Sequence, residues 1–82
     1  MLNLTNITIQ ERKDKNLNKY YLIFDKDTNN AYFCFPKALR EGWDYLENYQ
    51  NIKEVELEYE VNDKGNNKVV SLFAVREEEI IV

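Results

Sequence analysis

Within residues 53–61, charged and apolar side chains alternate strictly from Glu54 to Val61, and no other stretch constrains the fold as strongly. In an extended chain the apolar residues share one face: Val55, Leu57, Tyr59 and Val61. The glutamates share the other face: Glu54, Glu56, Glu58 and Glu60. Side chains of a β-strand alternate in direction, and same-face neighbours lie roughly 6.6–6.8 Å apart. Four like charges at that spacing are costly unless they face solvent or a basic partner. The pattern therefore predicts a strand with one buried and one solvent-facing side.

The composition indicates one small domain that covers residues 1–82. Hydrophobic residues make up 44% of the chain, which is enough for a core that needs neither a metal nor a disulfide. Cys34 is the only cysteine, and a lone cysteine is typical of a reducing compartment. We see no apolar leader and no apolar run of membrane-spanning length. We therefore expect a cytoplasmic protein.

Period-two patterns bounded by turn residues predict five strands. They are residues 2–10, 19–25, 31–35, 53–61 and 68–75. In the first of them, a slip in the alternation between Leu4 and Ile7 fits a bulge or a bend. The last residues, 76–82, are charged and then apolar, and would form a tail or a short extra strand.

Residues 36–50 have the pattern of an amphipathic helix. Pro36 suits its first turn, where a missing N–H costs nothing. Leu39, Trp43 and Leu46 then recur at the i, i+4, i+7 spacing of one helix face. Gly42 would lie inside this helix at a cost of roughly 1 kcal/mol relative to alanine, and would let the helix approach the sheet closely. We expect one helix at about 36–50.

The expected order is β-β-β-α-β-β in a mainly β (α+β) chain. This order resembles the oligonucleotide/oligosaccharide-binding (OB) fold, a small five-stranded barrel. Residues 31–76 are similar in layout to bacterial single-stranded-DNA-binding proteins: an aromatic third strand, a helix, a fourth strand and a glycine turn into the fifth. The resemblance implies a ligand surface on the second and third strands, flanked by the loops between strands one and two and between strands four and five.

Basic and aromatic residues fall where that surface would need them. Proteins that bind single strands combine rings on which bases stack with basic groups that follow the phosphates. We predict binding of single-stranded DNA or RNA through Arg12, Lys13, Lys15, Lys19, Lys64, Lys68, Tyr21 and Tyr32. Further rings alternate between the two faces of these strands, and the pattern leaves open which face is buried.

The charge is unevenly distributed along the chain. The net charge is −4 and the isoelectric point is about 4.8, whereas most domains that bind phosphates are basic. Residues 1–40 nevertheless carry a charge of +3, and residues 41–82 carry −7. A local positive surface can still bind nucleic acid, because charges more than about 8–10 Å away are screened.

The acidic residues support a rival function. Carboxylates at strand spacing can mimic a row of phosphates or dock on a basic groove. The contact set would be Glu54, Glu56, Glu58, Glu60, Glu77, Glu78 and Glu79. The chain would then be an acidic protein-binding module, or an inhibitor of a nucleic-acid-binding enzyme like those of phages and mobile elements. The simpler alternative is a charged strand face that prevents edge pairing and aggregation.

We predict no enzymatic activity, no metal and no cofactor. The chain has no histidine, which removes the commonest general base and the Ser-His and Cys-His pairs. Cys34 lies in an aromatic strand and fits a buried, inert thiol. The segment 25–29 resembles the start of a calcium loop, but the glycine and glutamate that should follow are absent. The sequence does not decide between a monomer and a homodimer.

Overall fold

The computed structural model describes residues 2–77, which form six strands and two short 3₁₀ helices. The strands are β1 (Leu2–Leu4), β2 (Ile7–Lys13), β3 (Lys19–Asp25), β4 (Asn30–Cys34), β5 (Ile52–Val61) and β6 (Asn67–Glu77). The 3₁₀ helices are η1 (Pro36–Ala38) and η2 (Trp43–Asn51), both between β4 and β5.

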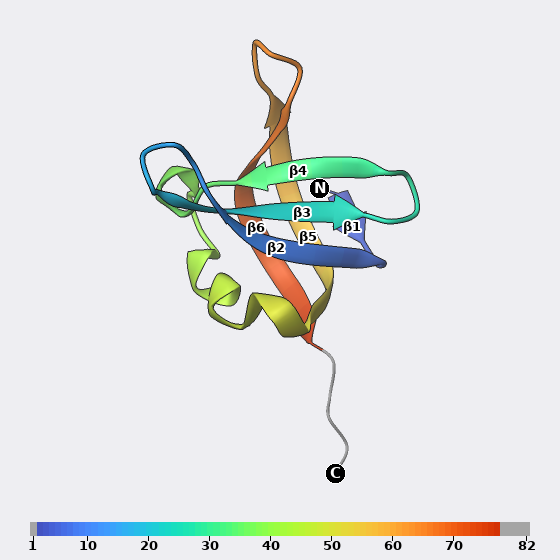
Figure 1. Ribbon diagram of the computed structural model, residues 1–82. Coiled ribbons are helices and arrows are strands. Elements are labelled where there is room, and N and C mark those ends of the chain that lie inside the picture. The colour runs from blue at the N-terminus through green and yellow to red at the C-terminus, as the bar shows by residue number, and fades with distance from the viewer. Residues whose placement is uncertain (1, 78–82) are drawn as a thin grey trace.

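All six strands belong to one curled, mixed sheet with the order β1-β5-β6-β4-β3-β2. Neighbours pair in antiparallel fashion, except that β4 and β6 are parallel. In Figure 1 the layer of β2, β3 and β4 crosses the β5–β6 pair steeply. The two end strands of the sheet, β1 and β2, are consecutive in the chain and separated only by Thr5 and Asn6. The chain therefore links both ends of the sheet order and gives it a barrel-like curl.

The predicted bend in the first strand is confirmed, and it changes the strand count. The chain pairs with β5 up to Leu4 and with β3 from Ile7 onward. Each half satisfies its backbone groups on a different partner, so the expected single strand at 2–10 becomes two. The prediction of five strands is wrong for this reason.

The acidic strand is confirmed as β5, and its alternation is only partly realised. Val55 and Leu57 are buried, as expected. Tyr59 is 41% exposed and Val61 63% exposed, because the β5–β6 hairpin projects beyond the β2–β4 layer (Figure 1). The buried face therefore ends where the hairpin leaves the barrel.

The predicted helix at 36–50 is wrong. Instead of continuing a helix, the segment after η1 pairs with β6: the Arg40 N–H donates to the Val70 carbonyl at 2.9 Å. The Leu72 N–H donates to the Glu41 carbonyl at 3.1 Å. Gly42 follows with a φ of 87°, a left-handed conformation in which η2 begins. These long-range backbone bonds replace those of a continuous α-helix.

The apolar residues of that segment still cover the core, with one exception. Leu46 is buried, and Leu39 and Tyr49 pack against the core. Trp43 is 60% exposed, because it directly follows the turn at Gly42. No helix in the described part of the chain is long and apolar enough to cross a membrane.

The core lies between the two crossing layers and consists mainly of aliphatic side chains. Its fully enclosed members include Ile7, Ile23, Ile52, Val55, Leu57, Val69 and Leu72. Cys34 is also completely buried, and burial raises the pKa of its thiol from 9.0 to about 12. The strand that carries Cys34 thus has one face fixed in the core.

The raised pKa of Cys34 leads to an expected pH dependence of stability. Folding favours the uncharged thiol, so this contribution is complete below about pH 9 and is lost as the pH rises toward 12. The loss is at most about 1.4 kcal/mol per pH unit. We expect wild-type protein to lose more unfolding free energy than Cys34→Ala between pH 8 and pH 10.5 in urea titrations. Parallel profiles would show that the thiol ionises freely in the folded protein.

Candidate nucleic-acid interface

The outer face of β3 and β4 is apolar although it lies outside the core. Ile23 and Cys34 point inward, so the alternate residues of both strands point outward. These outward residues are all half-buried: Tyr20, Leu22, Phe24, Ala31 and Phe33. An apolar, partly exposed sheet face of this kind is a candidate binding surface.

Three rings at one end of this face form the floor of a hollow of about 470 Å³. The Tyr20 and Phe35 rings stack, with centroids 5.3 Å apart and planes at 29°. The centroid of the Phe33 ring lies 6.3 Å from that of Tyr20. Cavities of this size accommodate a small ligand or a nucleobase. The hollow therefore offers ring surface at the scale that base stacking needs.

Two loops form the walls, and each is held by a side chain that caps its own turn. In the β2–β3 loop, Asp14 Oδ1 accepts the N–H groups of Asn16 at 2.8 Å and Asn18 at 2.9 Å. In the β5–β6 loop, Asn62 Oδ1 accepts the N–H groups of Lys64 at 3.0 Å and Asn66 at 2.9 Å. Such local bonds organise a turn without a ligand. Both walls are therefore preformed.

A second hollow of about 330 Å³ continues the first. It is lined by Asp14, Asn18, Lys19, Phe35, Pro36 and Lys37. The two hollows share Asp14 and Phe35, so they form one groove across the ends of β3 and β4. Four lysines line this groove against two aspartates: Lys19, Lys37, Lys64 and Lys68 against Asp14 and Asp63. The groove is locally positive on a chain of net charge −4.

The predicted basic residues divide between the groove and its surroundings. Lys19, Lys64 and Lys68 line it, and Lys19 also forms an ion pair with Glu11 at 3.6 Å. Arg12 pairs with Tyr20 in the sheet register and shares its outer face, where its guanidinium donates to Gln10 at 2.9 Å. Lys13 and Lys15 are exposed and lie outside the groove lining.

The two predicted tyrosines lie on the inner side of the sheet. Tyr32 is only 4% exposed and meets Tyr59 edge-on at 5.1 Å. Tyr21 packs against the core and against Tyr49 at 5.2 Å. Burial raises the pKa of both hydroxyl groups. The Tyr32 ring is therefore enclosed in the core, and the half-buried Tyr21 ring is covered by Tyr49 on one side.

The rings of the groove were missed as site residues, although one signal could have found them. Phe33 and Phe35 alternate with Cys34, which the sequence already indicated to be buried. A buried Cys34 requires both phenylalanines to point outward. The side of Tyr20 depends on the pairing of Tyr21 with Cys34, which only the structure shows. Lys37 could not be found in this way, because it lies in η1, where the alternation of the strand no longer applies.

The acidic row of β5 is not a uniform surface. Glu54 forms an ion pair with Arg76 at 3.6 Å, and Glu56 is half-buried opposite Asn3 of β1. Glu58 and Glu60 are exposed. Glu77 ends β6, while Glu78 and Glu79 and the remainder of the proposed tail lie outside the described residues.

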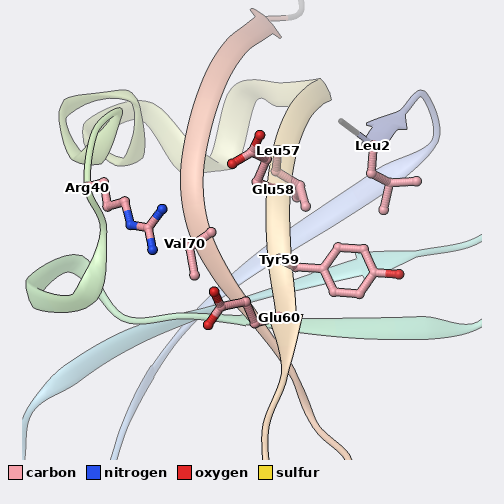
Figure 2. Close-up of a pocket in the computed structure, with 7 residues that line it drawn as sticks. All are labelled: Leu2, Arg40, Leu57, Glu58, Tyr59, Glu60 and Val70. Carbon is pink, nitrogen blue, oxygen red and sulfur yellow. The ribbon is translucent and has the colours of Figure 1, made fainter.

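The exposed glutamates border a third hollow of about 350 Å³. Figure 2 shows the carboxylates of Glu58 and Glu60 on the side of Val70 and Arg40, while Leu2 and Tyr59 lie on the other side. The Arg40 guanidinium gives this surface a mixed charge. The surface around Glu58 and Glu60 therefore resembles a row of phosphates less closely than the sequence predicted.

Comparisons with protein-family models, curated proteins and solved structures yield no match. Within residues 2–77, no group of three His, Cys, Asp or Glu side chains is arranged to hold a metal ion. The carboxylate of Asp25, which begins the calcium-like segment, instead accepts bonds from the Asp27 N–H at 3.1 Å and the Thr28 hydroxyl at 2.8 Å.

Proposed function

We propose that this chain is a non-enzymatic, cytoplasmic protein that binds single-stranded nucleic acid through an OB-type barrel. We count β1 and β2 as one bent strand 1, and β3, β4, β5 and β6 as strands 2, 3, 4 and 5. The sheet then follows the order 1-2-3-5-4-1, which begins and ends on the same strand. An OB barrel binds its ligand on strands two and three and the loops beside them. Those elements correspond here to β3, β4 and the loops at 14–18 and 62–66, which border the groove.

The observation that carries the proposal is the ring floor bordered by lysines. Stacking on an aromatic side chain contributes about 1–3 kcal/mol per base and tolerates any base, since every base has a π-face. Tyr20 and Phe35 supply that surface. Lysines at both ends of the groove attract the phosphates that connect stacked bases. A core-packing role does not explain this floor, because the rings lie on the outer side of the sheet.

The acidic alternative is a module that binds a basic protein, including an inhibitor of a nucleic-acid-binding enzyme from a phage or mobile element. Its contact surface is weaker than the groove, because only Glu58 and Glu60 of the β5 row are freely exposed. Arg40 stands beside them in the same hollow. We therefore place this alternative second.

Salt dependence tests the proposal. If each of the four groove lysines neutralises one phosphate, affinity for oligo(dT) should fall about 50-fold between 50 and 200 mM salt. In the double variant Lys64→Glu/Lys68→Glu, the loss of affinity between 50 and 200 mM salt should shrink to about sevenfold. The affinity itself should be lower than that of the wild type at every salt concentration. Fluorescence anisotropy with labelled oligonucleotide measures both quantities.

Lys26→Glu is the matched control, because Lys26 is exposed in the β3–β4 turn and lies outside the groove lining. Lys26→Glu should leave the dependence of affinity on salt concentration unchanged. A complete lack of binding at tens of micromolar protein would reject the nucleic-acid function. Capture of a basic partner that is lost in Glu58→Gln/Glu60→Gln would then support the alternative.

A further inference from the structure

Asp14 occupies the point where the two hollows of the groove meet, since it lines both of them. It is half-buried, and Lys19 and Phe35 line the second hollow together with it. A carboxylate in the middle of a surface that attracts phosphates is unexpected, because it repels them. Capping of the β2–β3 loop uses only one of its two oxygens.

The two oxygens of Asp14 have different roles. Oδ1 accepts two backbone N–H groups of the loop, those of Asn16 and Asn18. Among the side chains that the structure describes, none donates a hydrogen bond to Oδ2. The two bonds to Oδ1 hold the carboxylate in place, and Asp14 lines both hollows of the groove. A ligand in the groove would therefore meet a carboxylate whose second oxygen is still able to accept a hydrogen bond.

A fixed carboxylate restricts what can lie next to it. Phosphate oxygens carry no proton at neutral pH and are repelled by it, so the phosphates must lie toward the lysines. A polar group of the ligand that bonds to Asp14 must donate an N–H or O–H, because an ionised carboxylate only accepts hydrogen bonds. In a single strand the donors are the amino groups of the bases, the N–H of a base ring and, in RNA, the ribose hydroxyl.

We propose that Asp14 reads the exocyclic amino group of a base that is stacked on the Tyr20–Phe35 pair. This inference rests on the proposed nucleic-acid function and adds a base preference to it. Cytosine presents an amino group at the position where thymine and uracil present a carbonyl oxygen. The carboxylate thus accepts a hydrogen bond from cytosine and repels the carbonyl of thymine. Adenine also offers an exocyclic amino group, and guanine does so on its minor-groove edge.

Cytosine and thymine provide the cleanest comparison, because both are single-ring bases with similar stacking surfaces. A hydrogen bond to a charged group contributes about 1.5–3 kcal/mol, which corresponds to at least about tenfold in affinity. We expect wild-type protein to bind oligo(dC) of about ten nucleotides at least tenfold more tightly than oligo(dT) of the same length.

The decisive variant is Asp14→Asn. Asparagine retains the oxygen that caps the loop and replaces Oδ2 by an NH₂ donor, which suits the thymine carbonyl. The ratio of oligo(dC) to oligo(dT) affinity should fall to one or below. Asp44→Asn removes the same charge at an exposed position in η2 and should leave the ratio unchanged. Thermal melting confirms that each variant is folded.

An RNA arm separates the two sources of donors. If Asp14 contacts the ribose, Asp14→Asn will change the ratio of oligo(rC) to oligo(dC) affinity and leave the cytosine-to-thymine ratio intact, which overturns base reading. Equal binding of oligo(dC) and oligo(dT) by the wild type also overturns it, with the proposed function intact. Failure to bind any of the oligonucleotides rejects the proposed function, and base reading with it.

Discussion

Replacing Gly42 by alanine should lower the free energy of unfolding by about 2–5 kcal/mol. An added Cβ would come within 2.6 Å of the Leu72 Cβ, and it would overlap the Leu72 carbonyl oxygen directly. The φ of 87° adds a conformational cost for any residue with a Cβ. Because this turn also lies beside the backbone bonds to β6, the neighbouring atoms cannot move apart without breaking them. Urea denaturation followed by circular dichroism measures the change.

Gly65→Ala is the control for the conformational part of that cost. Gly65 has a similar φ of 79°, but nothing lies within 4 Å of the position its Cβ would occupy. Its replacement should therefore cost only about 1 kcal/mol, since strain is partly offset by a less flexible unfolded chain. The difference between the two variants isolates the close approach of Gly42 to β6. Equal losses would show that the approach is not rigid.

Gly42 also shows how far local patterns could predict the fold. The sequence indicated a glycine that permits close contact with the sheet, and the contact is present. The surrounding helix is not, because the i, i+4, i+7 spacing of apolar residues is equally compatible with an extended turn followed by a 3₁₀ helix. The choice depends on backbone bonds from Arg40 and Glu41 to β6, about thirty residues further along the chain. A local pattern contains no information about such partners.

The strands were more predictable because their signal is local. β3 was predicted with its observed limits, and β5 differs by one residue. The groove was predicted in part: the loop lysines follow from the position of the loops, whereas the rings depend on which side of β3 and β4 is buried. Both sides of β3 are apolar, so hydrophobicity alone could not decide. The curl of the sheet over Ile23 and Cys34 decides it.

Removing the ring floor should produce the largest loss of binding. Phe35→Ala should weaken the affinity for single-stranded oligonucleotide by about 5- to 150-fold, the value of one lost stacking contact. The backbone at this position should persist, because the Phe35 carbonyl accepts the Ala38 N–H at 2.9 Å and begins η1. Leu22→Ala is the matched control: Leu22 is half-buried on the same outer face and lies outside the groove lining.

The double variant Tyr20→Ala/Phe35→Ala then tests whether the rings act as one platform. Their centroids are 5.3 Å apart, so a base stacked on one ring also depends on the position of the other. Residues in contact of this kind are not additive. We expect the double variant to lose clearly less than the sum of the two single losses in binding free energy. Strict additivity would mean that the rings hold separate bases, and a Leu22→Ala loss as large as that of Phe35→Ala would mean that the ligand does not use the ring floor.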